Sequence, residues 1–164
     1  MKKLSNIALL ASGLLLAASC RLDFIDDDNV LCHDSWQYES VTTCSPDGTV
    51  TGFEDKTGSS SYVKFFYTGA WSFESESCTA PEYGLWSTEI VPVKGATFDV
   101  ILISDNPGSF IQKGHSGEVY KFSLTASGDT LSIIHKHTDA DEYRVNRFLR
   151  SSFSGFSIAN QKDH

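Results

Sequence analysis

Two histidines in the C-terminal third of the chain have a spacing that could serve metal chemistry. His135 and His137 are two residues apart, so on a β-strand both imidazoles point to one face, and Asp139, Asp141 and Glu142 follow them. Imidazole and carboxylate groups are ligands for zinc and copper. Histidines and acids at a strand end beside a polar turn are also ordinary solvated side chains. We therefore expect no metal site and no other cofactor.

The sequence contains no motif typical of an enzyme. Ser59-Ser60-Ser61 and Ser151-Ser152 lack the Gly-x-Ser-x-Gly context of an activated serine. No glycine pattern for binding phosphate or a dinucleotide occurs. His33-Asp34 and His115-Ser116 are isolated pairs whose partners depend on the fold. We predict that the protein is not an enzyme.

Cys20 offers more specific chemistry, because it ends a segment typical of secretory signals. A positively charged start precedes an apolar run from Ile7 to Ala18. That run of about a dozen residues is too short to span a bilayer. Its ending, Leu16-Ala17-Ala18-Ser19-Cys20, resembles the bacterial lipobox. The resemblance implies that residues 1–19 are removed and that Cys20 receives a diacylglyceryl thioether and an acylated amine, with fatty acids such as palmitate.

The residues after Cys20 indicate where such a lipoprotein would lie. Several acyl chains exceed what stable anchoring requires. Arg21 stands where an Asp would resemble a signal for inner-membrane retention, so we expect the outer membrane, with the domain facing the periplasm or the outside. Residues 20–33 are predicted to be a tether, because the acidic run Asp26-Asp27-Asp28-Asn29 favours an extended, solvated chain.

Length and charge limit the remaining possibilities. Removal of residues 1–19 from the 164 leaves 145 residues, which suits one domain with its own core. The signal takes away two lysines, so 11 basic and 21 acidic residues remain and the net charge moves from −8 to −10. An acidic domain binds nucleic acid and anionic membranes poorly. We expect no nucleic-acid partner, and membrane attachment only through the N-terminal lipid.

Three further cysteines would lie in an oxidising compartment that favours disulfides. Cys32, Cys44 and Cys78 can form one internal bridge at most, with three pairings open. We favour Cys44 with Cys78, because Cys32 lies nearer the tether. The remaining thiol is expected to be buried and passive.

From Ser35 onward the chain has the alternation of β-strands, separated by turn residues. Tyr120, Phe122 and Leu124 share one face of a predicted hairpin with Leu131 and Ile133, across a turn at 126–129. The other expected strands are 35–44, 62–67, 70–76, 85–93, 97–104 and 142–150.

About eight strands without a crossover helix predict an antiparallel up-and-down β-barrel over residues 34–158, with a β-sandwich as the alternative. Residues 159–164 would be a polar tail.

The strand sequences resemble those of bacterial lipocalin-like lipoproteins, which are barrels of the calycin type. The resemblance rests on Trp36, on Gly84-Leu85-Trp86, on the hairpin arms at 120–124 and 128–133, and on the final strand at 143–148. It implies that a basic residue of the last strand, here Arg147, stacks on Trp36 and closes one end of the barrel. Such a cation–π contact is worth on the order of 1–2 kcal/mol when partly desolvated.

The predicted barrel allows two functions. An eight-stranded barrel holds one small ligand or fills itself with side chains. In the first case the protein carries or sequesters a small hydrophobic ligand in the envelope, against an inward set of Phe98, Tyr120, Phe122, Leu131 and Ile133. In the alternative, a filled barrel is a protein-interaction module, such as an inhibitor of a basic hydrolase, whose charge an acidic domain would complement.

Overall fold

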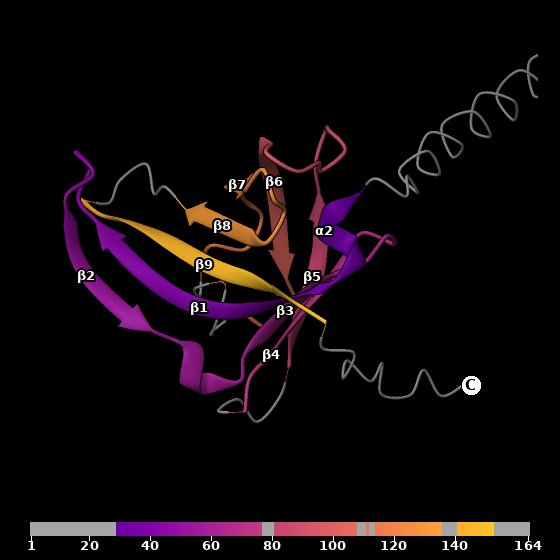
Figure 1. Ribbon diagram of the computed structural model, residues 1–164, viewed down its shortest axis with the longest axis horizontal. Coiled ribbons are helices and arrows are strands. Elements are labelled where there is room, and N and C mark those ends of the chain that lie inside the picture. The colour runs from indigo at the N-terminus through magenta and orange to yellow at the C-terminus, as the bar shows by residue number, and fades with distance from the viewer. Residues whose placement is uncertain (1–28, 77–80, 108–110, 112–113, 136–140, 153–164) are drawn as a thin grey trace, which may run out of the picture.

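The computed structural model describes residues 29–76, 81–107, 111, 114–135 and 141–152 (Figure 1). Its elements in chain order are α2 (Val30–His33), β1 (Ser35–Cys44), β2 (Val50–Asp55), the 3₁₀ turn η1 (Thr57–Ser59), β3 (Tyr62–Phe65), β4 (Ala70–Glu74), β5 (Glu82–Ser87), β6 (Thr97–Ser104), β7 (Glu118–Leu124), β8 (Thr130–His135) and β9 (Tyr143–Ser151). In this described part of the chain, no helix is both long and apolar enough to cross a membrane.

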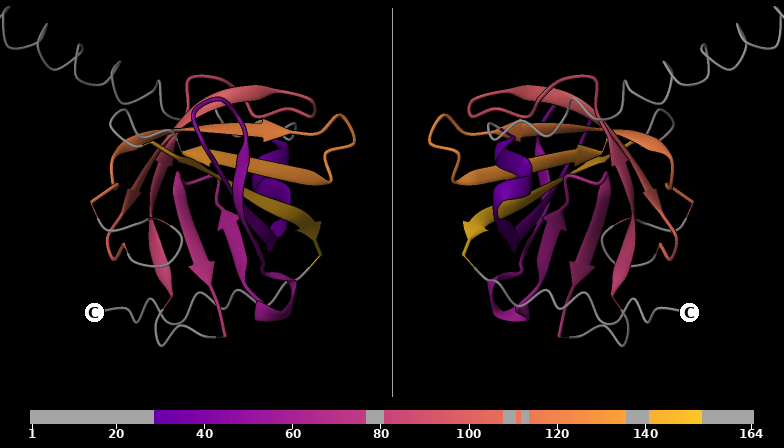
Figure 2. Two further views of the ribbon diagram at one scale, coloured as in Figure 1. Left: turned by 90° about the vertical axis from the view of Figure 1, so that its left-hand side faces the viewer. Right: turned by 90° about the vertical axis from the view of Figure 1, so that its right-hand side faces the viewer.

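The strands form one closed antiparallel barrel. Neighbouring strands pair in the order β1, β3, β4, β5, β6, β7, β8, β9, and β9 pairs again with β1, so the ring has eight strands. In Figure 2 the strands β3 and β4 run steeply across β8 and β9, as expected for strands strongly tilted around a small barrel. The structure confirms the predicted all-β barrel over the alternative sandwich.

Strand β2 lies outside this ring and was not predicted. β1 is long enough to pair with β3 near its start and with β2 near its end, while β9 pairs along its whole length. The turn from β1 to β2 contains Pro46, Asp47 and Gly48, which are typical turn residues. Hydrogen bonds from the Ser45 hydroxyl and the Thr49 backbone N–H to the Asp47 carboxylate lower the pKa of Asp47 to about 2.

The predicted hairpin of β7 and β8 is confirmed, and its apolar side chains point inward as predicted. Phe122 pairs with Ile133 and Leu124 with Leu131, and all four side chains are buried, as the alternation predicts. Gly128 supplies the positive φ, 76°, that the tight turn between the strands requires.

Most strand ends fall within two residues of the sequence-based expectation, and two segments differ by more. The strand expected at 85–93 is β5, which begins at Glu82 and ends at Ser87. The last part of the expected tether is folded, because residues 30–33 form α2, with Leu31 and Cys32 buried in the core. The N–H of Val30 donates to the carbonyl of Pro92, which ties α2 to the segment between β5 and β6.

Candidate functional site

The barrel interior is the first candidate for a binding site, and the residues predicted to line it do point inward. Phe98 on β6 pairs with Phe122 on β7, which pairs with Ile133 on β8. The five predicted lining side chains are at most 4% exposed: Phe98, Tyr120, Phe122, Leu131 and Ile133.

Close ring contacts occupy the space between these side chains. Phe122 packs against Phe98 and Phe65, with ring centroids 5.8 and 5.5 Å apart, and Phe65 packs against Trp86 at 5.7 Å. A side chain that lines a hollow of the size of a water molecule keeps accessible surface, yet Phe65, Phe122 and Ile133 have none. The described interior is therefore filled by its own side chains at these positions.

Both ends of the barrel are also covered. At one end α2 packs across the strands, and the indole Nε1 of Trp36 donates to the carbonyl of Leu31 at 3.0 Å. At the other end Ile111, from the segment between β6 and β7, is fully buried, and its N–H donates to the buried carboxylate of Glu82 at 3.2 Å. The Ser104 hydroxyl also donates to Glu82, at 2.9 Å, so two hydrogen bonds hold this carboxylate next to Ile111.

The structure does not bring Arg147 to Trp36, which corrects the expected cation–π contact. Trp36 is fully buried and its backbone partner on β9 is Arg150. Arg147 pairs with Ser40 further along β1, and its exposed side chain forms an ion pair with Glu39 at 2.6 Å. Arg147 points outward because the inward positions of β9 are the neighbouring Asn146 and Phe148.

Arg147→Ala is therefore expected to lower the free energy of unfolding by about 1 kcal/mol or less, because exposed ion pairs contribute little. Combined with Trp36→Ala, the two losses should add to within about 0.5 kcal/mol, as expected for separated sites. Urea denaturation of the four members of this double-mutant cycle measures the sum. A coupling energy above about 1 kcal/mol would restore the stacking contact.

The cysteines that the structure describes are buried thiols. Cys32 and Cys44 are both free, so the structure does not contain the expected bridge from Cys44 to Cys78. Cys20 and Cys78 themselves lie outside the described residues, and lipidation of Cys20 is not tested. Burial raises the pKa of Cys32 to about 12, while the charge of Lys64 acts in the opposite direction. Only the thiolate reacts as a nucleophile, so Cys32 is a passive thiol.

We expect Cys32 to resist alkylation in the folded protein. With a pKa of about 12, roughly 10⁻⁴ of this thiol is ionised at pH 8. Iodoacetamide with reductant present should leave the Cys32 peptide unmodified in native buffer and modify it fully in urea, as read by peptide mass spectrometry. Equal labelling under both conditions would show that α2 does not protect the thiol.

Where the hairpin of β7 and β8 opens, three polar side chains meet. Nδ1 of His115 lies 3.1 Å from Oε1 of Glu118, and Nε2 of His135 contacts Oε2 of the same carboxylate. From the sequence alone, the candidate metal ligands are His135, His137 and the acidic residues that follow them. His137, Asp139 and the rest of 136–140 lie outside the described residues. The spacing His115-x-x-Glu118 just before a hairpin is the signal that could have revealed this group.

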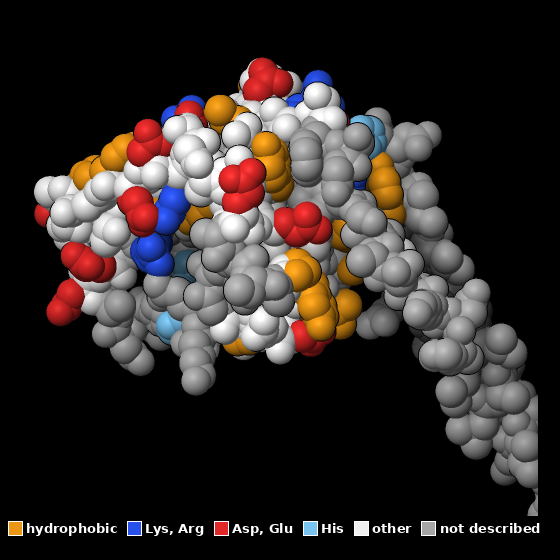
Figure 3. All heavy atoms as spheres, turned by 90° about the horizontal axis from the view of Figure 1, so that it is seen from below, with side chains coloured by type: hydrophobic (Ala, Val, Ile, Leu, Met, Phe, Trp, Pro, Cys, Tyr) orange, Lys and Arg blue, Asp and Glu red, His pale blue; other side chains and the backbone are white. Residues whose placement is uncertain are grey.

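The outer surface offers a second kind of candidate site, on β5, β6 and β7. Five apolar side chains there are 42–57% exposed: Tyr83, Leu85, Ile101, Ile103 and Val119. They are neighbours, because Leu85 pairs with Ile103 and Ile101 pairs with Val119. We call these five residues the outer apolar face. Hydrophobic side chains also reach the surface beside acidic ones in the view of Figure 3.

A groove of about 390 Å³ lies where β3 begins and β4 ends. Ser60, Tyr62, Glu74, Ser75 and Glu76 line it. Burial raises the pKa of Glu74. Each of these five residues carries a hydroxyl or a carboxyl group, so a ligand in the groove would have to satisfy polar groups as well as apolar surface.

Comparisons of the chain with protein-family models, with curated proteins and with solved structures found no match.

Proposed function

We propose that the protein is a protein-interaction module of the bacterial envelope, anchored through a lipid on Cys20, whose filled barrel binds a basic partner protein with the outer apolar face. This is the second of the two functions that the sequence allows. The observation that carries it is the contrast between the two surfaces of the sheet: the inward side is occupied by its own side chains, while apolar side chains on the outward side are accessible.

The exposed residues of the outer apolar face are adjacent to one another rather than scattered over the surface. Its members stand on three adjacent strands, where Leu85 pairs with Ile103 and Ile101 pairs with Val119 across the sheet. Contiguous exposed apolar patches mark interaction sites, whereas isolated exposed apolar residues do not. Covering five half-exposed side chains gains about 1 kcal/mol each. The total, about 5 kcal/mol, barely offsets the roughly 4–15 kcal/mol that association costs. Apolar contact alone would bind weakly, so polar or charged contacts must add to it.

Charge indicates what those contacts are. Asp99 lies on β6, two residues before Ile101, and Asp105 follows directly after the strand, two residues after Ile103. Both are exposed, so they lie at the two ends of the outer apolar face. Asp99 forms an ion pair with Lys121, at 2.7 Å. Acidic residues still exceed basic ones by ten over residues 20–164. A partner with an apolar centre and lysine or arginine around it would complement this surface. That describes a basic protein, such as a basic hydrolase.

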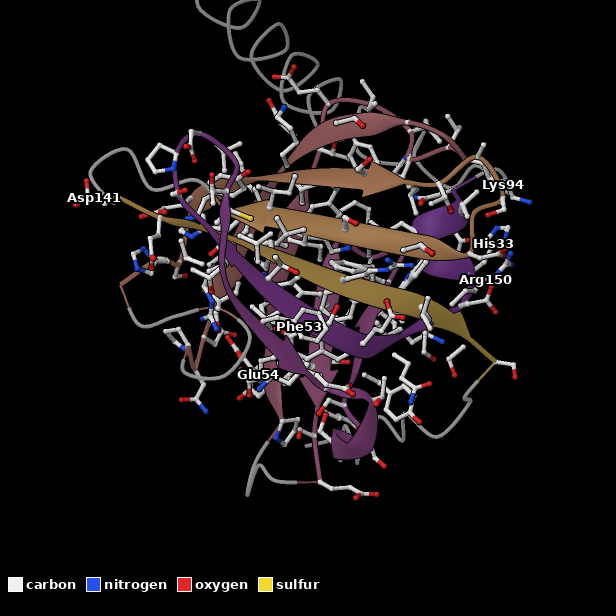
Figure 4. All side chains as sticks on the ribbon, turned by 60° about the vertical axis from the view of Figure 1, so that its left-hand side comes forward. His33, Phe53, Glu54, Lys94, Asp141 and Arg150 are labelled. Atoms are coloured by element: carbon white, nitrogen blue, oxygen red, sulfur yellow. The ribbon has the colours of Figure 1, made fainter. Side chains whose placement is uncertain are left out.

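The test compares two variants of the soluble chain, Cys20→Ser without residues 1–19, immobilised and exposed to envelope extract of the cells that produce it and to a basic hydrolase such as lysozyme. Leu85→Ser with Ile103→Thr removes apolar surface from the outer apolar face. Phe53→Ser is the matched control, since Phe53 is 69% exposed on β2, well away from that face (Figure 4). Circular dichroism checks that both variants fold.

A basic protein should be retained by the wild type and by Phe53→Ser, and at least tenfold less by the double variant. Retention should also weaken steeply between low and high salt, because exposed charges are screened beyond about 10 Å at 0.1 M. Equal retention by all three forms would contradict the proposal. So would a small apolar molecule that the folded chain carries and that denaturation releases.

A further inference from the structure

We infer that His115, Glu118 and His135 form a binding site for a divalent transition metal, with Zn²⁺ the ion that best fits the ligands. The site lies at the end of the barrel opposite α2. It is independent of the proposed protein-binding function, because none of the three residues belongs to the outer apolar face.

The register of the sheet brings the three residues together. Phe122 pairs with Ile133 and Lys121 with Ile134, so continuing the same register places Tyr120 opposite His135. Side chains two residues apart on a strand share a face, which puts Glu118 on the same inward side as Tyr120, next to His135. His115 precedes Glu118 by three residues and enters the group from the segment before β7.

The distances suit a small metal ion. One nitrogen of each histidine and a carboxylate oxygen of Glu118 all lie within 4.8 Å of one another, and His115 Nδ1 is 3.1 Å from Glu118 Oε1. Ligand atoms of a tetrahedral zinc, at about 2.0–2.2 Å from the ion, are roughly 3.3 Å apart. Shifts of about an ångström therefore suffice to place Zn²⁺ among them, in the place now taken by the hydrogen bonds between the imidazoles and the carboxylate.

Neighbouring groups already hold two of these ligands in position. The ring of Tyr120 stacks on His135, with centroids 4.4 Å apart and an interplanar angle of 21°. The Tyr120 hydroxyl donates to the backbone carbonyl of His115 at 3.2 Å, which holds the segment that carries His115. Such outer contacts orient metal ligands.

The site is also open enough for an ion to enter. The side chain of His135 is 10% exposed, that of His115 is 21% exposed and that of Glu118 is 39% exposed. Solvent can therefore reach the position between the ligands, and a water molecule would complete a four-coordinate site.

The ligand set decides which ion fits. Two imidazoles with one carboxylate occur in zinc sites, whereas Mg²⁺ and Ca²⁺ require oxygen ligands almost throughout.

The experiment is calorimetric titration of ZnCl₂ into the untagged soluble chain, residues 20–164 with Cys20→Ser, kept reduced at pH 7.5. All described residues lie within this range. We expect one Zn²⁺ per chain and binding at least tenfold weaker in His115→Ala and in Glu118→Gln. The matched control is His33→Ala, which should bind Zn²⁺ like the wild type. His33 is an exposed histidine at the α2 end of the barrel, and Figure 4 shows it at the opposite end from Asp141.

Cobalt gives a second measurement, because Co²⁺ bound in a tetrahedral site absorbs visible light far more strongly than hydrated Co²⁺. This absorption should appear with the wild type and His33→Ala and be lost in Glu118→Gln. If Glu118→Gln does not fold by circular dichroism, His115→Gln replaces it, since His115 lies outside the strands. The inference is overturned if Zn²⁺ does not bind, or if it binds with unchanged affinity to both ligand variants.

Discussion

Gly84→Ala is expected to lower the free energy of unfolding by on the order of 3 kcal/mol or more, because the new methyl group has no space. A Cβ at position 84 would lie 1.8 Å from the carbonyl oxygen of Ile103, 2.8 Å from its carbonyl carbon and 2.9 Å from the Cα of Ser104. These are backbone atoms of β6, so no side-chain rotation relieves the clash. The indole Nε1 of Trp71 donates to the same Ile103 carbonyl at 3.1 Å, and moving β6 would disturb that hydrogen bond.

Gly58→Ala is the matched control for this prediction. A Cβ at position 58 has no atom within 4 Å, and the substitution should change stability by about 0.5 kcal/mol or less. Urea denaturation followed by tryptophan fluorescence measures both. A loss below about 1 kcal/mol for Gly84→Ala would mean that β5 and β6 are not this close.

Trp36→Ala should cost about 3–5 kcal/mol, as removal of a fully buried aromatic side chain from a packed core does. The side chain is 0% exposed, and its Nε1 donates to Leu31, so the substitution also releases the hydrogen bond that holds α2 on the end of the barrel. Loss of α2 would uncover Cys32, which lies beside Leu31 in the core.

Trp36→Phe separates packing from the hydrogen bond, since it keeps most of the ring and loses the donor. We expect it to cost about half as much as Trp36→Ala, in the range of 1.5–2.5 kcal/mol. In both variants Cys32 should react with iodoacetamide faster than in the wild type. If Trp36→Ala unfolds at the same urea concentration as the wild type, the tryptophan does not close this end of the barrel.

The sequence predicts the fold best where alternation and turn chemistry agree, and the hairpin of β7 and β8 is such a place. It misleads at β5, where the inward positions are Glu82, Gly84 and Trp86 and the outward positions include Tyr83 and Leu85. A buried carboxylate and a glycine facing inward reverse the usual pattern, and the predicted start at Leu85 is three residues later than the observed start at Glu82. Hydrogen bonds from Ser104 and Ile111, which no local pattern reveals, make the burial of Glu82 tolerable.

An inward polar residue on β9 likewise explains why the expected contact of Arg147 with Trp36 is wrong. Apolar residues on β9 suggest a face with Tyr143 and Val145, but the buried face carries Asn146 and Phe148. Asn146 is satisfied in the core by Tyr38, whose hydroxyl donates to it at 2.6 Å. The metal-ligating group shows a further limit: its residues come from two strands and the segment before them, and only the register between the strands brings them together.

Native mass spectrometry of the soluble Cys20→Ser chain, compared with its denatured mass, tests most directly whether the barrel is filled. After incubation with fatty acids and envelope lipids and removal of the excess, the native mass should equal that of the chain alone. Such a result supports binding through the outer apolar face rather than in the barrel interior. A stoichiometric apolar molecule that stays bound in the native state and leaves on denaturation would contradict it, because a side-chain-filled interior has no room for one.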